Sequence, residues 1–217
     1  IMGLVGPNGA GKTTTLRCLA GIIPASLGQV RIGGMDIATD PVAAKRQLAF
    51  IPDEPRLFEH LTVEQHLNFV ARLYAVADWR ERGTELLDEL EMADKRQLLP
   101  SELSRGMKQK LAIACGLLHA PRAVILDEPL TGLDPYGIRR MKNSMRRLAA
   151  DGVAIILRSH LLDLVAEVCT HLLILKEGHN LADGSVAQVR ARCMADGAES
   201  LVDVLFLATG ESESSPE

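Results

Sequence analysis

The feature that most constrains the fold is a glycine-rich loop between an apolar segment and a helical pattern. Residues 1–5 are apolar, residues 6–13 read Gly-Pro-Asn-Gly-Ala-Gly-Lys-Thr, and a helical pattern over 14–20 follows at once. This order predicts a strand, a loop and a helix with the spacing G-x-x-x-x-G-K-[ST]. Chance would place four such fixed positions somewhere in the chain only about 1% of the time, and the flanking segments lower that figure further.

The chemistry of this loop favours a phosphorylated ligand. A side chain at Gly9 or Gly11 would block phosphate oxygens from backbone N–H groups or forbid the required dihedral angles. The helix N-terminus that follows favours an anion, Lys12 can reach the β- and γ-phosphates, and the Thr13 hydroxyl can bind Mg²⁺. The expected nucleotide-binding residues are Gly6, Pro7, Asn8, Gly9, Ala10, Gly11, Lys12, Thr13 and Thr14.

Composition excludes some classes of function. The chain has 217 residues, enough for one large α/β domain or a domain with an inserted lobe. Its net charge of −4 argues against a nucleic-acid groove, and no nucleic acid is expected as a partner. No run of about 18 apolar residues suggests a membrane span. Ile1-Met2 does not resemble a natural start, so we expect that a native N-terminal piece is lacking.

The four cysteines, Cys18, Cys115, Cys169 and Cys193, are far apart and form no C-x-x-C pair. Cys18 and Cys115 lie in helical patterns with apolar neighbours. We interpret the cysteines as buried free thiols, which is consistent with a reducing compartment.

Short strands alternate with helices along the chain, which predicts a three-layer α/β domain. Strands are expected at 29–32, 35–37, 48–51, 123–126, 153–157 and 171–176, with a hairpin turn at 177–180; helices are expected at 41–47, 63–75, 78–90, 106–119, 135–150, 161–169, 186–193 and 201–208. Thr62 and Gln65 form a capping-box pattern.

The expected fold class is α/β: a P-loop NTPase three-layer core with a mainly parallel sheet, an inserted α-helical subdomain and a partial β-hairpin subdomain. We divide the chain into a first core part with the hairpin (1–55), the helical insertion (56–119), a second core part (120–209) and an acidic, serine-rich tail (210–217). The composition of the tail predicts disorder.

A second chemical motif follows the apolar strand 123–126. In a P-loop protein, an aspartate at the end of such a strand completes the Mg²⁺ site. Asp127 is expected to hold the ion, through water, and Glu128 to orient and polarise the attacking water. The alternative is a helix-capping Asp-Glu pair on a turn, but two adjacent carboxylates at a buried strand's end are costly without a cation or a proton.

Five segments in this order resemble the motifs of ATP-binding cassette (ABC) ATPases: the P-loop (6–14), the signature (103–109), Walker B (126–129), the D-loop (132–135) and the switch histidine (159–160). The resemblance covers nearly the whole chain, and the signature makes it specific because other P-loop families lack it. It implies that two copies pair head to tail, with each ATP between one chain's P-loop and the other chain's signature.

The resemblance also implies roles for single residues. In trans, the signature residues Ser104, Arg105, Gly106 and Met107 would clamp the partner's ATP; the alternative for Ser104 is a simple helix N-cap. Asp134 would lie across the dimer interface and can cap the following helix as well. His160 would contact the γ-phosphate and position the water. The other histidines, His60, His66, His119, His171 and His179, have no such context and no assigned role.

The sequence departs from the family pattern near the expected metal. Asp53 stands where the family usually has glutamine, and its carboxylate can still bind Mg²⁺, so the expected metal-binding residues are Thr13, Asp53 and Asp127. Arg105 and Met107 replace two usual signature residues. The family's adenine-stacking aromatic residue precedes the first strand, and Tyr74, Trp79 and Tyr136 are not placed to replace it. We therefore expect weakened nucleotide binding.

The resemblance implies a Mg²⁺-dependent ATPase subunit that drives a separate membrane permease, at the inner face of the cell membrane and on its cytoplasmic side. The signature and the Pro-Asp-Glu-Pro loop resemble those of bacterial drug, lipid or polysaccharide exporters. Residues 56–100 are the expected docking surface, with Leu57, Phe58 and Leu61 as contacts. The alternatives are a soluble cassette for translation or DNA repair and a non-hydrolysing scaffold; a P-loop kinase or GTPase fits least, since no Asn-Lys-x-Asp motif is present.

Overall fold

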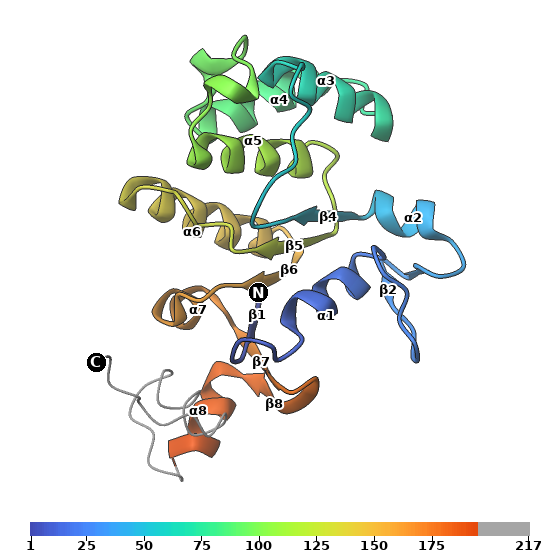
Figure 1. Cartoon of the computed structure of the whole chain (residues 1–217), viewed down its shortest axis with the longest axis vertical. Helices are drawn as coiled ribbons and strands as arrows, with labels where there is room; N and C mark the ends of the chain where they lie inside the picture. Colours follow the sequence, from blue (N-terminus) through green and yellow to red (C-terminus); the bar gives the residue numbers. More distant parts are fainter. Residues whose placement is uncertain (195–217) are drawn as a thin grey trace.

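A six-stranded sheet with the strand order β4-β5-β6-β1-β7-β8 forms the centre of the molecule (Figure 1), for which the computed structural model describes residues 1–194. The strands are β1 (Met2–Val5), β4 (Leu48–Ile51), β5 (Ala123–Asp127), β6 (Ala154–Arg158), β7 (His171–Lys176) and β8 (His179–Ser185). Neighbouring strands are parallel except for the antiparallel pair β7 and β8. The predicted α/β fold with a mainly parallel sheet is confirmed.

Helices cover both faces of this sheet. They are α1 (Lys12–Leu19), α2 (Pro41–Arg46), α3 (Val63–Tyr74), α4 (Trp79–Glu89), α5 (Arg105–Leu117), α6 (Pro135–Ala150), α7 (Leu162–Val168) and α8 (Val186–Met194), with 3-10 turns η1 (Ala93–Lys95) and η2 (Pro100–Glu102). Successive strand residues alternate between two cores, as the pleat requires: Leu4 packs with α1 and α2, whereas Val5 belongs to the larger core beneath α5, α6 and α7.

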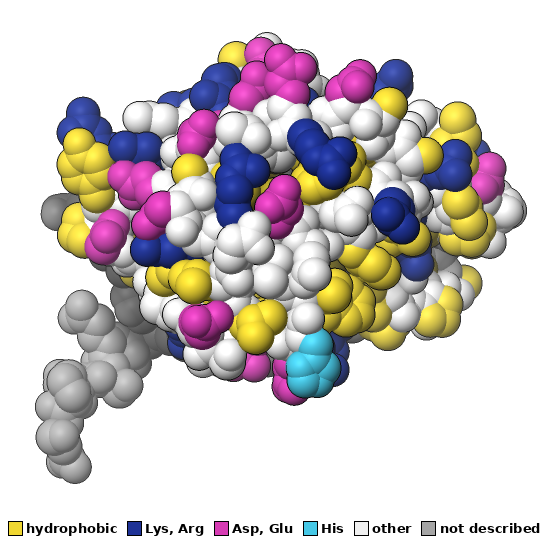
Figure 2. Space-filling view, turned by 90° about the horizontal axis from the view of Figure 1, so that it is seen from above, with side chains coloured by type: hydrophobic (Ala, Val, Ile, Leu, Met, Phe, Trp, Pro, Cys, Tyr) yellow, Lys and Arg dark blue, Asp and Glu magenta, His cyan; other side chains and the backbone are white. Residues whose placement is uncertain are grey.

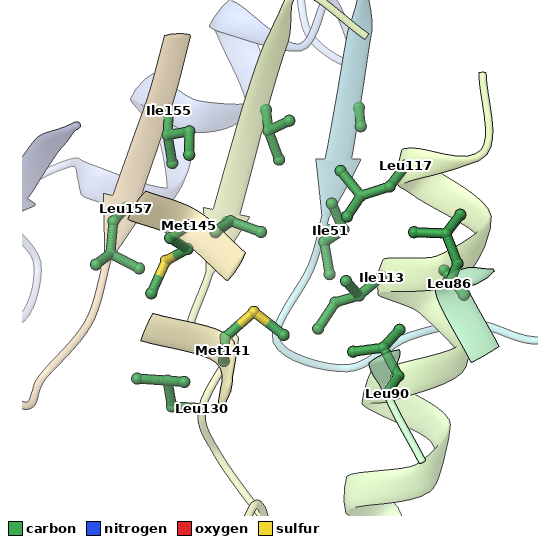
Figure 3. Packing of buried hydrophobic residues seen from close by; sticks show 14 of the residues in the cluster. Ile51, Leu86, Leu90, Ile113, Leu117, Leu130, Met141, Met145, Ile155 and Leu157 are labelled. Atoms are coloured by element: carbon green, nitrogen blue, oxygen red, sulfur yellow. The ribbon is translucent and has the colours of Figure 1, made fainter. Parts of the chain in front are cut away.

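The larger core joins the sheet to a helical lobe. In Figure 1, α3 and α4 lie at one end of the molecule and α5 lies between them and β4. Figure 3 shows Ile113 and Leu117 of α5 directed toward Ile51 of β4, and α5 is also in contact with α3 and α4 of the lobe. Helix α5 is therefore packed from both sides, and this packing fixes the position of its N-terminal residues.

Local sequence signals account for several element boundaries. The capping box at the start of α3 is present, with the Thr62 side chain accepting from the Gln65 backbone and the Gln65 side chain accepting from the Thr62 backbone. Pro41 and Pro135 each occupy the first helical turn, where the missing N–H costs nothing. The β2 (Arg31–Ile32) and β3 (Met35–Asp36) hairpin forms its own two-stranded sheet around the predicted Gly33-Gly34 turn.

Two predictions of local structure need correction. The turn after β7 is shorter than predicted, because His179 and Asn180 pair with β7 as the first residues of β8. The first hairpin strand begins at Arg31 instead of Gln29. The predicted helix 201–208 and tail 210–217 lie outside the described residues. Within residues 1–194, none of the helices combines the length and apolar character needed to cross a bilayer.

The cysteines agree in part with their predicted role as buried thiols. Cys18, Cys115 and Cys169 are free; Cys169 is buried, whereas Cys18 and Cys115 are only half-buried. Burial raises the pKa of the Cys115 and Cys169 thiols to about 12, so both are inert at neutral pH. The side chain of Cys193 lies outside the described part of the structure.

His66 has a structural role that the sequence did not indicate. Its ring is buried; Nε2 accepts a hydrogen bond from the Phe58 backbone N–H at 3.0 Å, and Nδ1 lies 2.8 Å from the Thr62 carbonyl oxygen. Because Phe58 N–H can only donate and the Thr62 carbonyl can only accept, this pair of bonds requires the neutral imidazole with its hydrogen on Nδ1. Burial lowers the pKa of His66, and the bond to Thr62 partly offsets this.

The lowered pKa predicts a loss of stability on acidification. The unfolded chain takes up a proton near pH 6.5 and the folded chain only at lower pH, so the free energy of unfolding falls as the pH drops below about 6.5. Thermal melts at pH 7.5 and 5.5 should show a smaller pH effect in His66→Gln than in the wild type. The exposed His179→Gln serves as the control; equal pH effects in His66→Gln and the wild type would contradict the assignment.

Candidate active site

The glycine-rich loop has the backbone conformation that its sequence predicts. Gly9 has φ of +79°, and a Cβ added there would meet no atom within 4 Å, so glycine is required by conformation rather than by crowding within the chain. Gly11, with φ of +94°, is the N-cap of α1, and no side chain caps this helix end. The first turn of α1 is therefore open to an anionic ligand.

Lys12 lies against the loop that precedes it. Its Nζ donates to the carbonyl oxygens of Gly6 at 2.7 Å and Pro7 at 2.6 Å. The ammonium group is thus held at the mouth of the loop, in the region where a motif of this kind places the phosphates of a nucleotide.

The strand order brings the other chemical residues to the same edge of the sheet. β6 lies between β5 and β1, and Arg158 of β6 is in register with both Asp127 of β5 and Leu4 of β1. These three parallel strands therefore end side by side, and the loop of residues 6–11, the Asp127-Glu128 pair and His160 all follow their carboxyl ends. Ligand groups of open parallel sheets gather at this edge.

Glu128 and His160 are brought into direct contact. Oε2 of Glu128 lies 2.8 Å from His160 Nδ1 and accepts from the backbone N–H of His160 and from Ser159 Oγ, each at 3.3 Å. The Glu128 side chain is only 7% exposed, whereas that of His160 is 67% exposed. Glu128 also has a left-handed φ of +52°, a conformation that is uncommon for a residue with a side chain.

An arginine that the sequence analysis missed completes this cluster. Arg158 Nη1 donates to Asp127 Oδ1 at 2.5 Å, and Nη2 lies 3.9 Å from Glu128 Oε1. The signal was visible in the sequence, since Arg158 is a charged residue at the end of an otherwise apolar strand and stands two positions before His160.

The predicted metal-binding residues face a common space. Thr13, Asp53 and Asp127 all line a cleft of about 940 Å³ between the sheet edge and the helical lobe. A hydroxyl and two carboxylates are the oxygen donors that Mg²⁺ prefers, and Mg²⁺ is usually held by one or two carboxylates together with substrate phosphates. No group of three or more His, Cys, Asp or Glu side chains suited to a metal occurs in the described range.

The signature residues lie at the start of α5. Ser104 is exposed and caps this helix by accepting from the Met107 backbone N–H at 3.2 Å, so the capping alternative is confirmed. The side chain of Arg105 is exposed, and Nη2 donates to Asp53 Oδ1 at 3.2 Å. Two of the positions at which the sequence departs from the family pattern therefore form one ion pair.

Gly106 is enclosed by its own chain. A Cβ at this position would lie 2.5 Å from the carbonyl oxygen of Gly132, which belongs to the D-loop. The D-loop then continues into α6, whose N-cap Asp134 accepts from Gly137 N–H at 2.6 Å. The signature and the D-loop are thus in close contact within one chain. The capping role of Asp134 is confirmed. The roles of Ser104 and Asp134 in trans stay predictions.

The outer part of the cleft is apolar. Its lining includes Phe58, Phe69 and Leu73, which are 54%, 44% and 63% exposed, and the rings of Phe58 and Phe69 meet edge to face with centroids 4.9 Å apart. Figure 2, which looks onto the end of the molecule with the helical lobe, shows hydrophobic side chains at the surface among charged ones. Of the predicted contacts only Phe58 is well exposed; Leu57 and Leu61 are half-buried.

The three aromatic residues considered for nucleotide stacking are engaged in other contacts, and of the three Tyr74 lines the cleft that contains Thr13. Tyr74 stacks on His119 with centroids 3.9 Å apart, Trp79 is buried in the helical lobe, and Tyr136 lies at the start of α6 beside Arg140. None of these contacts involves the glycine-rich loop.

Comparisons with known proteins agree with this geometry. A family model described as ABC transporter matches residues 1–131. The chain is 33% identical over 220 residues to the ABC-type transporter ATP-binding protein EcsA of Bacillus subtilis, covering all of this chain and 88% of EcsA. It is 36% identical over 185 residues to the Nod factor export ATP-binding protein I of Paraburkholderia xenovorans, covering 84% of this chain and 61% of that protein, which is less than two thirds of its length.

A solved structure gives the same result in three dimensions. The structure of an ATP-binding subunit of an ABC transporter matches with a TM-score of 0.90 and 34% sequence identity, covering 95% of this chain and 87% of that one. The agreement therefore extends to the arrangement of elements around the site.

The close contact at Gly106 predicts a sharp effect of one methyl group. Gly106→Ala should lower the free energy of unfolding by about 2 kcal/mol or more, because Cβ and the Gly132 carbonyl oxygen cannot both keep their places. Gly83→Ala is the matched control: Gly83 lies in α4, its Cβ would meet nothing closer than 3.4 Å, and alanine favours the helix by up to about 1 kcal/mol. Denaturant unfolding of both variants tests this, and equal stability of Gly106→Ala and wild type would refute it.

Proposed function

The chain belongs to the family of ABC transporter ATP-binding proteins, and on that premise we propose that it hydrolyses ATP in a head-to-tail dimer that powers a separate membrane permease. The observation that carries this proposal is the convergence of the glycine-rich loop, the Asp127-Glu128 pair and His160 at the ends of three adjacent strands. A binding module without hydrolysis would not need a buried carboxylate in contact with a histidine at that edge.

Binding of the nucleotide uses the loop and the first turn of α1. Backbone N–H groups there can donate to phosphate oxygens, and Lys12 can exchange the Gly6 and Pro7 carbonyl oxygens for the β- and γ-phosphates. Thr13, Asp127 and, in this chain, Asp53 would hold Mg²⁺, which neutralises phosphate charge when bound.

Hydrolysis is assigned to Glu128 and His160. Glu128 can accept a proton from, and so orient, the attacking water, because its carboxylate lies at the strand edge and is held by Ser159 and His160. The His160 ring is exposed, so it can contact the γ-phosphate of a nucleotide bound at this edge of the sheet.

The second copy supplies what one chain lacks. Ser104 and Arg105 are exposed at the start of α5, and within the chain their contacts are with Met107 and Asp53. In a head-to-tail dimer, Ser104, Arg105, Gly106 and Met107 would face the partner's ATP, and Asp134 would lie at the interface. The packing of Gly106 against the D-loop would then couple the two shared sites.

The apolar part of the cleft is assigned to the permease. Phe58, Phe69 and Leu73 expose large apolar side chains along one cleft, and such surfaces mark interaction sites. The same cleft is lined by Asp53 and Asp127, so a partner seated there would sense the state of the nucleotide site. The proposal puts the chain on the cytoplasmic side of the membrane, and the name of one relative, a Nod factor export protein, favours export.

The decisive variant is Glu128→Gln. It keeps the size of the side chain and removes the base, so steady-state ATP turnover should fall by about 100-fold or more, while gel filtration with ATP should show a stable dimer. Glu81→Gln, on the exposed side of α4, is the control and should retain full turnover. Unchanged turnover in Glu128→Gln would remove Glu128 from this role.

A further inference from the structure

Two adjacent carboxylates are buried side by side in this chain. Asp127 and Glu128 are 5% and 6% exposed; Asp127 is the last residue of β5 and Glu128 follows it. Burying two negative charges next to each other is strongly unfavourable unless a cation or hydrogen-bond donors compensate them. Within the chain, the compensating charge comes from the neighbouring strand.

Arg158 is the compensating cation. Its Nη1 lies 2.5 Å from Asp127 Oδ1 and its Nη2 lies 3.9 Å from Glu128 Oε1, so one guanidinium faces both carboxylates. The guanidinium is always charged at physiological pH. Another facing group, His160, contacts Glu128 and is mostly exposed. The ion pair described for Asp127 is therefore the one with Arg158.

The position of Arg158 is fixed by the backbone. Arg158 is in register with Asp127, and its carbonyl oxygen accepts from Glu128 N–H at 2.9 Å. Its side chain lines the same cleft as Thr13, Asp53 and Asp127, and its Nε is buried with no hydrogen-bond partner among the described residues. Because buried donors without a partner are rare, packing alone does not explain why an arginine stands at this position.

We propose that Arg158 is the resident counter-ion of the Asp127-Glu128 pair, so that Mg²⁺ must compete with its guanidinium for Asp127. The proposal rests on the function proposed above for Asp127 and makes Arg158 a positioning residue that tunes the metal requirement. It holds the two carboxylates in place when no metal is present, and it weakens metal binding because a positive charge already occupies the site.

The first test needs neither nucleotide nor metal. Thermal unfolding is measured in EDTA for the wild type, Arg158→Met, Asp127→Asn and the double variant. Arg158→Met should lower Tm by about 5 °C or more, because it leaves the buried Asp127 carboxylate without its ion pair and removes the nearby positive charge from Glu128. In the Asp127→Asn background the same change should lower Tm by less than about half as much. Arg146→Met, which removes an exposed ion pair between α6 and Glu167, is the control and should change Tm by about 2 °C or less.

The second test measures the metal directly. Binding of a fluorescent ATP analogue is followed as Mg²⁺ is titrated, and Arg158→Met should reach half-saturation at a Mg²⁺ concentration at least about threefold lower than the wild type requires. Arg158→Lys keeps the charge, so its Mg²⁺ requirement should remain near that of the wild type. If Arg158→Met does not fold, Arg158→Lys is measured in its place, and the expected result is that the Mg²⁺ requirement does not decrease.

The results separate the proposal from its alternatives. Equal Tm losses in both backgrounds, or a Mg²⁺ requirement that does not fall in Arg158→Met, would make Arg158 a packing residue and overturn the proposal; so would a lowered requirement in Arg158→Lys. If no nucleotide binds to any variant, the function proposed for the chain fails, but the comparison in EDTA still decides whether Arg158 is the counter-ion of Asp127.

Discussion

The site depends on burying negative charge at the end of a parallel strand. β5 is enclosed on both faces, so Asp127 and Glu128 emerge from an apolar interior, and the structure stabilises them with donors from β6 and the loop after it. Because β6 also pairs with β1, the strand that compensates these charges is the one that aligns them with the glycine-rich loop. The position of β6 between β5 and β1 therefore both compensates the buried charges and assembles the site.

The departures from the family pattern are related in space. Asp53 adds a carboxylate to the cleft, and Arg105, at the start of a helix that is packed on two sides, forms an ion pair with it. Arg158 adds a further cation at the inner carboxylates. The extra negative charge of Asp53 is thus balanced by Arg105, whereas Arg158 balances Asp127 and Glu128. Since Arg105 also belongs to the signature, its engagement with Asp53 links the cleft to the surface proposed to meet a second copy.

Much of the fold was predictable from the sequence because its signals are local. The capping box at Thr62, the prolines that open α2 and α6 and the apolar strand before Asp127 each act within a few residues. The contacts that the sequence did not reveal are long-range. Pairing of Arg158 with Asp127 depends on strand order, and the hydrogen bond from the Phe58 N–H to His66 depends on how a loop returns to α3. The strand β8 was not predicted because its sequence, His-Asn-Leu-Ala-Asp-Gly-Ser, has little strand propensity and is stabilised by pairing with β7.

The central claim is that two copies share two sites, and mixing two inactive variants tests it most directly. Lys12→Ala disables the glycine-rich loop and Ser104→Arg disables the signature, so each homodimer has no intact site. In a head-to-tail heterodimer, the loop of one chain meets the intact signature of the other and one site is restored. An equimolar mixture should therefore regain up to about a quarter of wild-type ATP turnover, since half of the dimers are mixed and each has one of two sites. A mixture no more active than either variant alone would contradict the shared site.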